Sequence, residues 1–281
     1  MKWLIPLNFF DKPLCDIIQV MQLAFNQFNV TEDSAAGRQS ILILHGLFGS
    51  KRNWQSIARQ ISEQCQVFTL DLRNHGESDH HEDMTYQAMA DDVFRFISEH
   101  SLENVTIIGH SMGGKVAMQM ALQHPEIIKK LVIIDIAPVK YEHGFNDLIN
   151  SLKSLPLDQI SSRQEADKHL RQTVQPETLR QFLLQNLKNS ADGFSWRINL
   201  DAIQANIEAL MDFPGKHCDT QYQNSVLFLK GEKSDYIKHE YERTIFKIFS
   251  RALFITVADT GHWLHAENPD FVVGEIRKFI K

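Results

Sequence analysis

Short apolar runs alternate with longer amphipathic stretches along most of the chain. The apolar runs are residues 40–44, 66–72, 105–108, 130–134, 225–229 and 252–257. Continuous apolar runs bounded by turn residues are typical of parallel strands that are buried on both faces. Apolar positions at helical spacing fill residues 53–64, 86–100, 243–249 and 270–280. This alternation predicts an α/β fold, in which helices cover both faces of a mostly parallel sheet.

The alternation breaks between residues 139 and 222, where helical stretches follow one another with no convincing strand between them. These stretches are residues 146–155, 163–172, 176–188 and 201–211. A helical insertion of this length predicts a cap over the carboxyl edge of the sheet.

The domain organisation follows from this break. We expect a core made of residues 21–138 and 223–281, a helical cap at 139–222, and an N-terminal extension at 1–20 whose composition differs from the rest. Polar and apolar residues alternate just after this extension, in residues 21–29, which predicts an edge strand.

Composition and charge exclude several classes of function. The 281 residues carry a formal net charge of -6 without a run of lysines or arginines, which disfavours nucleic-acid binding. No apolar stretch reaches the length of a membrane span, and the apolar part of residues 1–14 is too short for a signal-peptide core. The cysteines Cys15, Cys65 and Cys218 are widely spaced, which favours a reducing compartment, with the cytoplasm as the default, and predicts no metal site.

The stretch from residue 104 to 122 is the first candidate for chemistry. An apolar run stops at Gly109, Ser111 lies between Gly109 and Gly113, and good helix formers follow at once. This order predicts a strand, a sharp turn and a helix, with Ser111 at the apex. Such a turn exposes the serine hydroxyl and points the first amides of the helix toward whatever the serine attacks.

Other reactive side chains also follow predicted strands. They are His45, Asp71, Asp135, Ser234, Asp235 and His262. Ligands of open parallel sheets bind outside the carboxyl ends of the strands, so we expect these residues near Ser111. A neutral serine needs a base, and the base needs a carboxylate that orients it. The order Ser111, an acid, then His262 is the one expected after a turn of this kind.

The region from about residue 40 to 281 resembles the α/β-hydrolase superfamily. Within it, the sequence looks like small bacterial esterases related to the abhydrolase-domain proteins of mitochondria. The motifs that carry this resemblance are residues 45–50 (His-Gly-Leu-Phe-Gly-Ser), 71–76 (Asp-Leu-Arg-Asn-His-Gly), 109–114 (Gly-His-Ser-Met-Gly-Gly) and 135–138 (Asp-Ile-Ala-Pro). The resemblance implies that Ser111 is the nucleophile and His262 the base. It also implies that the backbone amides of Leu47 and Met112 form the oxyanion hole.

The acid of the triad is open between two residues. Many relatives place it in a Gly-x-x-Asp turn after the cap, but here Ser234 holds that slot after Gly231, and Asp235 comes one residue later. Asp135 follows the neighbouring strand, where some members of the superfamily place their acid. We therefore expect Asp135 to be the acid, with Asp235 as the alternative and Ser234 as a possible helper near the histidine.

Several other polar residues have a simpler structural explanation. We expect His45 to stabilise its own loop, Asp71 to fix the turn at residues 73–76, and His110 to have a structural or substrate-shaping part. An exposed loop explains residues 80–83 (His-His-Glu-Asp) better than a metal site does. His265 competes with His262 for the base, but His262 directly follows Gly261 and fits the family pattern.

The expected function is that of a serine esterase without metal or organic cofactor. It would cleave short- to medium-chain esters, or thioesters, of small-molecule substrates. The cap offers an apolar lining and no cluster of Arg or Lys, which indicates an apolar acyl group and does not fix its chain length. The candidates for that lining are Phe145, Phe182, Leu183, Phe194, Trp196 and Phe213. Thioesterase or C–C bond hydrolase activity on the same triad is one alternative. A non-catalytic ligand-binding module is another, and the presence of all three triad residue types disfavours it.

Overall fold

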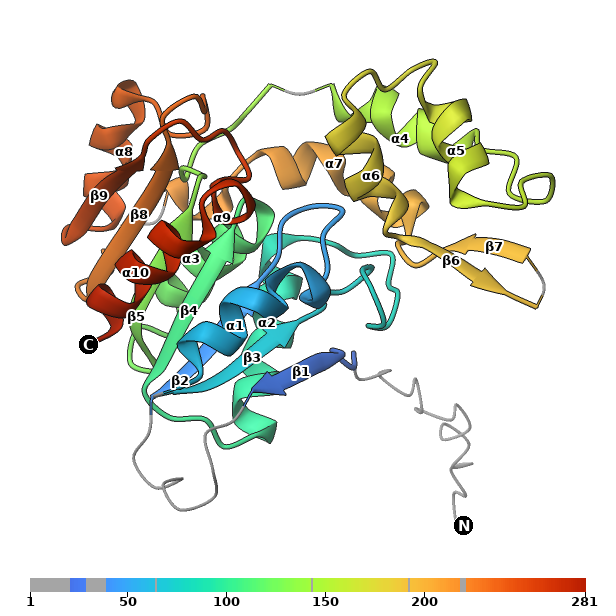
Figure 1. The fold of residues 1–281 in the computed structure, drawn as a ribbon. Helices are drawn as coiled ribbons and strands as arrows, with labels where there is room; N and C mark the ends of the chain where they lie inside the picture. Colours follow the sequence, from blue (N-terminus) through green and yellow to red (C-terminus); the bar gives the residue numbers. More distant parts are fainter. Residues whose placement is uncertain (1–20, 29–38, 64, 143, 192, 218–220) are drawn as a thin grey trace, which may run out of the picture.

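The computed structural model describes residues 21–28, 39–63, 65–142, 144–191, 193–217 and 221–281. The expected N-terminal extension at 1–20 lies outside the described residues, and so do Cys15 and Cys218. Within the described residues, seven strands form one sheet (Figure 1). Their order is β1 (Phe25–Phe28), β3 (Gln66–Leu70), β2 (Ser40–Leu44), β4 (Val105–His110), β5 (Ile128–Ile134), β8 (Ser225–Gly231) and β9 (Ala252–Val257).

The sheet confirms the expected α/β architecture. Strand β1 pairs antiparallel with β3 at one edge, as the alternation in residues 21–29 predicted, and the other neighbouring strands pair in parallel. In the central register, Leu44 pairs with Gly109 and His110 pairs with Ile134. This register brings the residues that follow β2, β4 and β5 to the same edge of the sheet.

Each face of the sheet carries its own apolar core. Alternate residues of β2 point to opposite faces, so Leu42 and Leu44 join one core while Ile41 and Ile43 join the other. The first core includes α2 (Tyr86–Glu99), α3 (Met112–Gln123) and α8 (Glu242–Ile248), and the second includes α1 (Gln55–Ile61) and α10 (Pro269–Ile280). Burying one such Leu or Ile side chain stabilises the fold by about 2 kcal/mol.

Short helices complete the loops around the sheet. They are η2 (Lys51–Trp54), η3 (Pro214–His217), η4 (His239–Tyr241) and α9 (Leu264–Glu267). None of the helices in the described part of the chain has both the length and the apolar character that crossing a membrane requires.

The segment between β5 and β8 lies over the carboxyl ends of the strands (Figure 1). Its described residues form α4 (Phe145–Lys153), α5 (Arg163–Leu170), α6 (Glu177–Leu184), α7 (Leu200–Met211) and a hairpin of β6 (Leu187–Ser190) and β7 (Gly193–Trp196). We call this segment the cap. It is tied to the core by polar contacts: Asn199 N donates to Asn74 O at 2.9 Å, and Asn206 Nδ2 donates to Glu82 O at 2.7 Å.

The hairpin corrects one expectation. The helix predicted for residues 176–188 ends at Leu184, and residues 187–190 form a strand instead. Asn side chains favour hydrogen bonds to the nearby backbone over continued helix. Asn186 makes such a bond, from its Nδ2 to Leu183 O at 3.2 Å, and the helix stops there. Gly193 then begins β7 with a φ of 99°, a conformation that suits glycine.

Candidate active site

Ser111 stands at a strained turn between β4 and α3. Its φ is 51°, and its backbone N–H donates to Ile134 O at 3.0 Å, which fixes the turn against β5. The flanking glycines are required by space, because a Cβ on Gly109 would lie 2.3 Å from Gly113 O, and one on Gly113 would lie 2.5 Å from Leu44 O. The strand–turn–helix predicted around Ser111 is therefore confirmed.

The base and acid candidates meet at the carboxyl ends of neighbouring strands. His262 Nδ1 donates to Asp135 Oδ2 at 2.8 Å, and the Asp135 side chain is fully buried. The other carboxylate oxygen, Oδ1, accepts the N–H of Gly231 at 3.1 Å. Ser234 Oγ donates to the same Oδ2 that His262 uses. These three donors hold the carboxylate in one orientation, and their hydrogen bonds stabilise its buried negative charge.

Asp235, the alternative acid, lies elsewhere. It is exposed and lines the wall of a cavity, whereas it is Asp135 whose carboxylate bonds His262. The reason is the turn after β8, in which Ser234 N donates to Gly231 O at 3.1 Å. This turn directs Ser234 inward to Asp135 and leaves the next residue outside.

His262 has two further neighbours that sequence patterns did not indicate. The ring of Tyr236 stacks on its imidazole, with centroids 3.9 Å apart and planes at 21°. His110 Nε2 donates to the backbone carbonyl of His262 at 2.9 Å. Burial holds the pKa of His110 well below its usual value, so this histidine is neutral and acts as a hydrogen-bond donor. The structural part expected for His110 agrees with this contact.

His265, the competing base, packs against Trp54, whereas it is His262 that bonds Asp135. Its ring stacks on Trp54, with centroids 4.3 Å apart and planes at 9°. Burial lowers the pKa of His265 to about 3, so it stays neutral at physiological pH.

His45 and Asp71 both hold loops at the sheet edge, as expected. His45 Nδ1 donates to Gly46 O at 2.8 Å, and its Nε2 accepts the N–H of Leu72 at 3.0 Å. Asp71 accepts from Lys51 Nζ at 2.6 Å and from the N–H of Glu77 at 2.9 Å.

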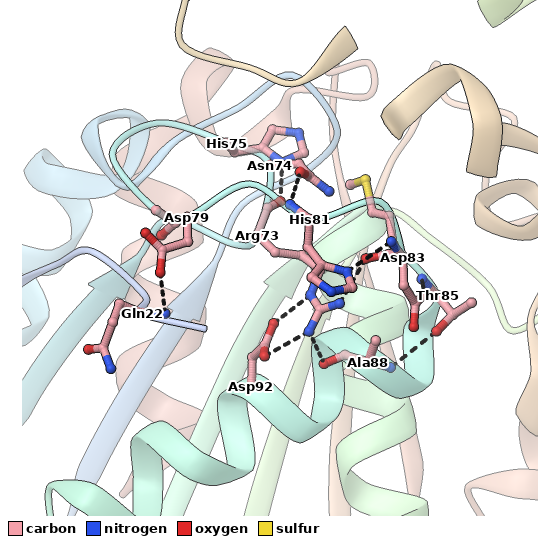
Figure 2. A network of polar contacts seen from close by, with 12 residues as sticks. Gln22, Arg73, Asn74, His75, Asp79, His81, Asp83, Thr85, Ala88 and Asp92 are labelled. Atoms are coloured by element: carbon pink, nitrogen blue, oxygen red, sulfur yellow. Dashed lines mark hydrogen bonds and ion pairs between the residues drawn. The ribbon is translucent and has the colours of Figure 1, made fainter. Parts of the chain in front are cut away.

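The loop that contains His81 and Asp83 is exposed, and the side chains of these two residues bond locally (Figure 2). His80 Nε2 donates to Arg197 O in the cap at 3.2 Å. The N–H of Asp83 donates to His81 Nδ1 at 3.0 Å. Beneath this loop, Arg73 is paired with buried Asp92 at 2.6 Å and donates to Asp83 O at 2.7 Å. Among the residues that the structure describes, no group of three or more His, Cys, Asp or Glu is arranged to hold a metal ion.

A cavity with two lobes surrounds Ser111. One lobe, of about 220 Å³, also contacts His262 and is lined by Trp54, Leu148, Leu179, Phe182 and Trp263. The other, of about 490 Å³, extends past Met112 to Tyr86, Lys115, Tyr141 and Asp235. Leu47, Ser111, Phe145 and Tyr236 line both lobes.

The apolar residues expected to line the cavity divide into three pairs. Phe145 and Phe182 line the lobe that contacts His262, whereas Leu183 and Phe213 are buried in the packing of the molecule. The remaining two, Phe194 and Trp196, belong to β7. The cap therefore supplies part of the lining and uses its other apolar side chains for its own packing.

Comparisons with known proteins agree with this geometry. The family described as alpha/beta hydrolase fold matches residues 39–269. A "Putative esterase/lipase" of Haemophilus influenzae is 41% identical over 242 residues, which cover 85% of this chain and 82% of the relative. The "sn-1-specific diacylglycerol lipase ABHD11" of Mus musculus is 36% identical over 256 residues, covering 88% and 83%. A solved structure, "Marine microorganism esterase", is 39% identical with a TM-score of 0.87 and covers 92% of this chain and 99% of its own.

Proposed function

Because the chain belongs to the α/β-hydrolase fold family and is a carboxylic ester hydrolase, we propose that it cleaves short- to medium-chain esters through a Ser111–His262–Asp135 triad. One observation carries the proposal. The buried Asp135 carboxylate accepts the Nδ1–H of His262 at 2.8 Å, and His262 and Ser111 line the same lobe of the cavity. With the proton on Nδ1, the Nε2 atom of His262 is the basic one.

The reaction then follows from the chemistry of these groups. The Ser111 hydroxyl oxygen attacks the ester carbonyl carbon while Nε2 of His262 takes the hydroxyl proton. The C–O bond to the alcohol breaks, and His262 returns the proton to the departing oxygen. A water molecule then attacks the acyl carbon and loses a proton to His262. The bond from that carbon to Ser111 Oγ breaks, His262 returns the proton to Oγ, and the carboxylic acid leaves. Asp135 stabilises the imidazolium that forms in each half.

The developing negative charge on the carbonyl oxygen needs donors, and we assign them to the backbone amides of Leu47 and Met112. Met112 is the first residue of α3, where the N–H has no partner within the helix and the helix dipole is positive. Leu47 follows His45 and Gly46 at the end of β2 and lines both lobes beside Ser111. Losing one such donor typically lowers kcat by about 10²–10³-fold.

The size and lining of the cavity support the substrate class. A lobe of about 220 Å³ lined by aromatic and aliphatic side chains fits an apolar group of modest length. A thioester reacts by the same steps, so thioesters remain a second candidate. We expect the enzyme to work without a cofactor and in the cytoplasm, in keeping with the three widely spaced cysteines.

The test is a panel of p-nitrophenyl esters and acyl thioesters of increasing chain length, measured with the wild-type protein and with Ser111→Ala. We expect turnover of the shorter members by the wild type, and none by Ser111→Ala with unchanged thermal unfolding. A serine-reactive fluorophosphonate should label the wild type and not Ser111→Ala, because the Ser111 hydroxyl is the group that reacts with it. A binding module without chemistry would not be labelled in either form. Turnover retained by Ser111→Ala would contradict the proposal.

A further inference from the structure

The loop that carries the Leu47 amide contains a strained residue. Gly49 N donates to Gly46 O at 2.9 Å, which closes a tight turn with Leu47 and Phe48 at its centre. Phe48 has a φ of 62°, in the left-handed region that a bulky side chain seldom adopts. Such a conformation costs about 1–3 kcal/mol and persists only where the surroundings hold it in place.

Two hydrogen bonds hold Phe48, and they come from different parts of the molecule. Its N–H donates to Nε2 of His75 in the core at 3.2 Å. Its carbonyl accepts from Nδ2 of Asn186 in the cap at 2.7 Å. One bond restrains the peptide before Phe48 and the other the peptide after it, so the pair fixes both φ and ψ of the strained residue.

Both partners are themselves fixed. His75 Nδ1 donates to Arg73 O at 3.0 Å, which leaves Nε2 as an acceptor, and burial lowers the pKa of His75 to about 3. Asn186 is 3% exposed, its N–H donates to Leu183 O at 3.1 Å, and its carbonyl accepts from Arg197 N at 2.8 Å. The end of α6 and the start of the hairpin therefore set where the Asn186 side chain points.

We propose that Asn186 is a positioning residue for the oxyanion hole: by holding the Phe48 carbonyl from the cap, it keeps the Leu47 N–H directed at the substrate oxygen. The hole is then complete only while the cap is docked on the core. The inference rests on the proposed function, because it concerns a donor of that same reaction.

A neighbouring contact provides a matched control. Gln185, the residue before Asn186, accepts at its Oε1 from Asn53 Nδ2 at 2.9 Å, and this bond also joins cap and core. Gln185 is exposed and bonds the Asn53 side chain, whereas Asn186 bonds the Phe48 carbonyl. If general docking of the cap were what matters, removing either side chain would have the same effect.

The experiment compares Asn186→Ala and Gln185→Ala with the wild type in kcat, KM and the inhibition constant of an alkyl trifluoromethyl ketone. The ketone adds to Ser111 and places an oxyanion in the hole, so it reports the hole directly. For Asn186→Ala we expect kcat to fall about 10–100-fold, less than for a deleted donor, with KM within about 3-fold. The inhibition constant of the ketone should rise by the same factor by which kcat/KM falls. Gln185→Ala should match the wild type in all three quantities.

Several outcomes would overturn the inference. One is an Asn186→Ala variant that keeps the kcat and the ketone affinity of the wild type, or that changes in KM alone. Another is a Gln185→Ala variant that loses as much kcat and ketone affinity as Asn186→Ala does. If Asn186→Ala fails to fold, Asn186→Leu, which is close to Asn in size and has neither a donor nor a charge, carries the same expectation. Circular dichroism and the end-point of fluorophosphonate labelling give the folded, active fraction. Activity in Ser111→Ala would refute the proposed function itself, whereas an inactive Ser111→Ala with wild-type Asn186 variants would refute only the role of Asn186.

Discussion

The Ser234 hydroxyl donates to Oδ2 of Asp135, the oxygen that also accepts the Nδ1–H of His262. The slot that the acid occupies in many relatives thus holds a hydroxyl, which supports an acid on the adjacent strand. A hydrogen bond to a charged group is worth about 1.5–3 kcal/mol, so this contact is strong enough to affect how Asp135 holds the base.

Replacing Ser234 by alanine removes one of three donors to the carboxylate. We expect kcat/KM for a p-nitrophenyl ester to fall about 3- to 10-fold, less than the full value of the bond because water can replace the hydroxyl in part. Ser234→Thr, which keeps the hydroxyl, is the control. A rate unchanged in Ser234→Ala would contradict a helper role.

The two candidate acids can be separated by paired substitutions. Asp135→Asn should lower kcat by about 10³–10⁴-fold, because the amide no longer stabilises the imidazolium and favours the wrong tautomer of His262. Asp235→Asn should leave kcat within about 2-fold, since Asp235 is exposed and it is Asp135 that bonds His262. A larger loss in Asp235→Asn than in Asp135→Asn would reverse the assignment.

Tyr236 should contribute through its ring. A ring stacked on an imidazole is worth about 0.5–1.5 kcal/mol, and somewhat more once the imidazole is charged. Tyr236→Phe keeps the stack and should retain kcat, whereas Tyr236→Leu should lower kcat about 3- to 10-fold. Steady-state kinetics distinguish this from a lining role alone, which would change KM and leave kcat as it is.

Stability should fall at acidic pH because buried histidines stay neutral. The pKa of His75 and that of His265 are lowered to about 3, whereas an unfolded histidine titrates near its ordinary value of 6.5. Below that value the unfolded chain binds protons that the folded protein does not. The stability is therefore fully present above about pH 6.5 and is lost as the pH falls toward about 3, by about 2 kcal/mol per histidine at pH 5.

Urea unfolding of the wild type and of His265→Phe between pH 5 and 8 tests this expectation. Phenylalanine retains a ring to stack on Trp54 and cannot titrate. The free energy of unfolding should decrease less steeply toward pH 5 in the variant, by about 2 kcal/mol over the range. Parallel curves for the two proteins would show that His265 is protonated in the fold as it is in the unfolded chain.

Local patterns predicted the elements whose environment is uniform. Residues 40–44, all of which are buried, form a strand at the expected bounds, because a continuous apolar run between turns predicts a strand covered on both faces. The β6–β7 hairpin was missed because its exposed residues, Lys188, Asn189 and Ser190, carry no apolar alternation. Residues 187–190 form a strand because they pair with β7, and a local sequence pattern does not record such pairing.

The site divides in the same way. Ser111, Asp135 and His262 could be proposed from sequence because each directly follows a strand or lies in a strand-exit loop, and parallel strands end at one edge. The stack of Tyr236 on His262 could not, since it depends on the path of a loop. The bond from Asn186 to Phe48 joins residues 138 positions apart and depends on how the cap meets the core.

The Asn186–Phe48 bond also bears on protein engineering. Caps are attractive parts to exchange, since they line the cavity while leaving the catalytic strands intact. In this enzyme a transplanted cap would have to present an amide donor to the Phe48 carbonyl as well as a new lining. A chimera chosen for pocket shape alone would bind its intended ester and turn it over slowly.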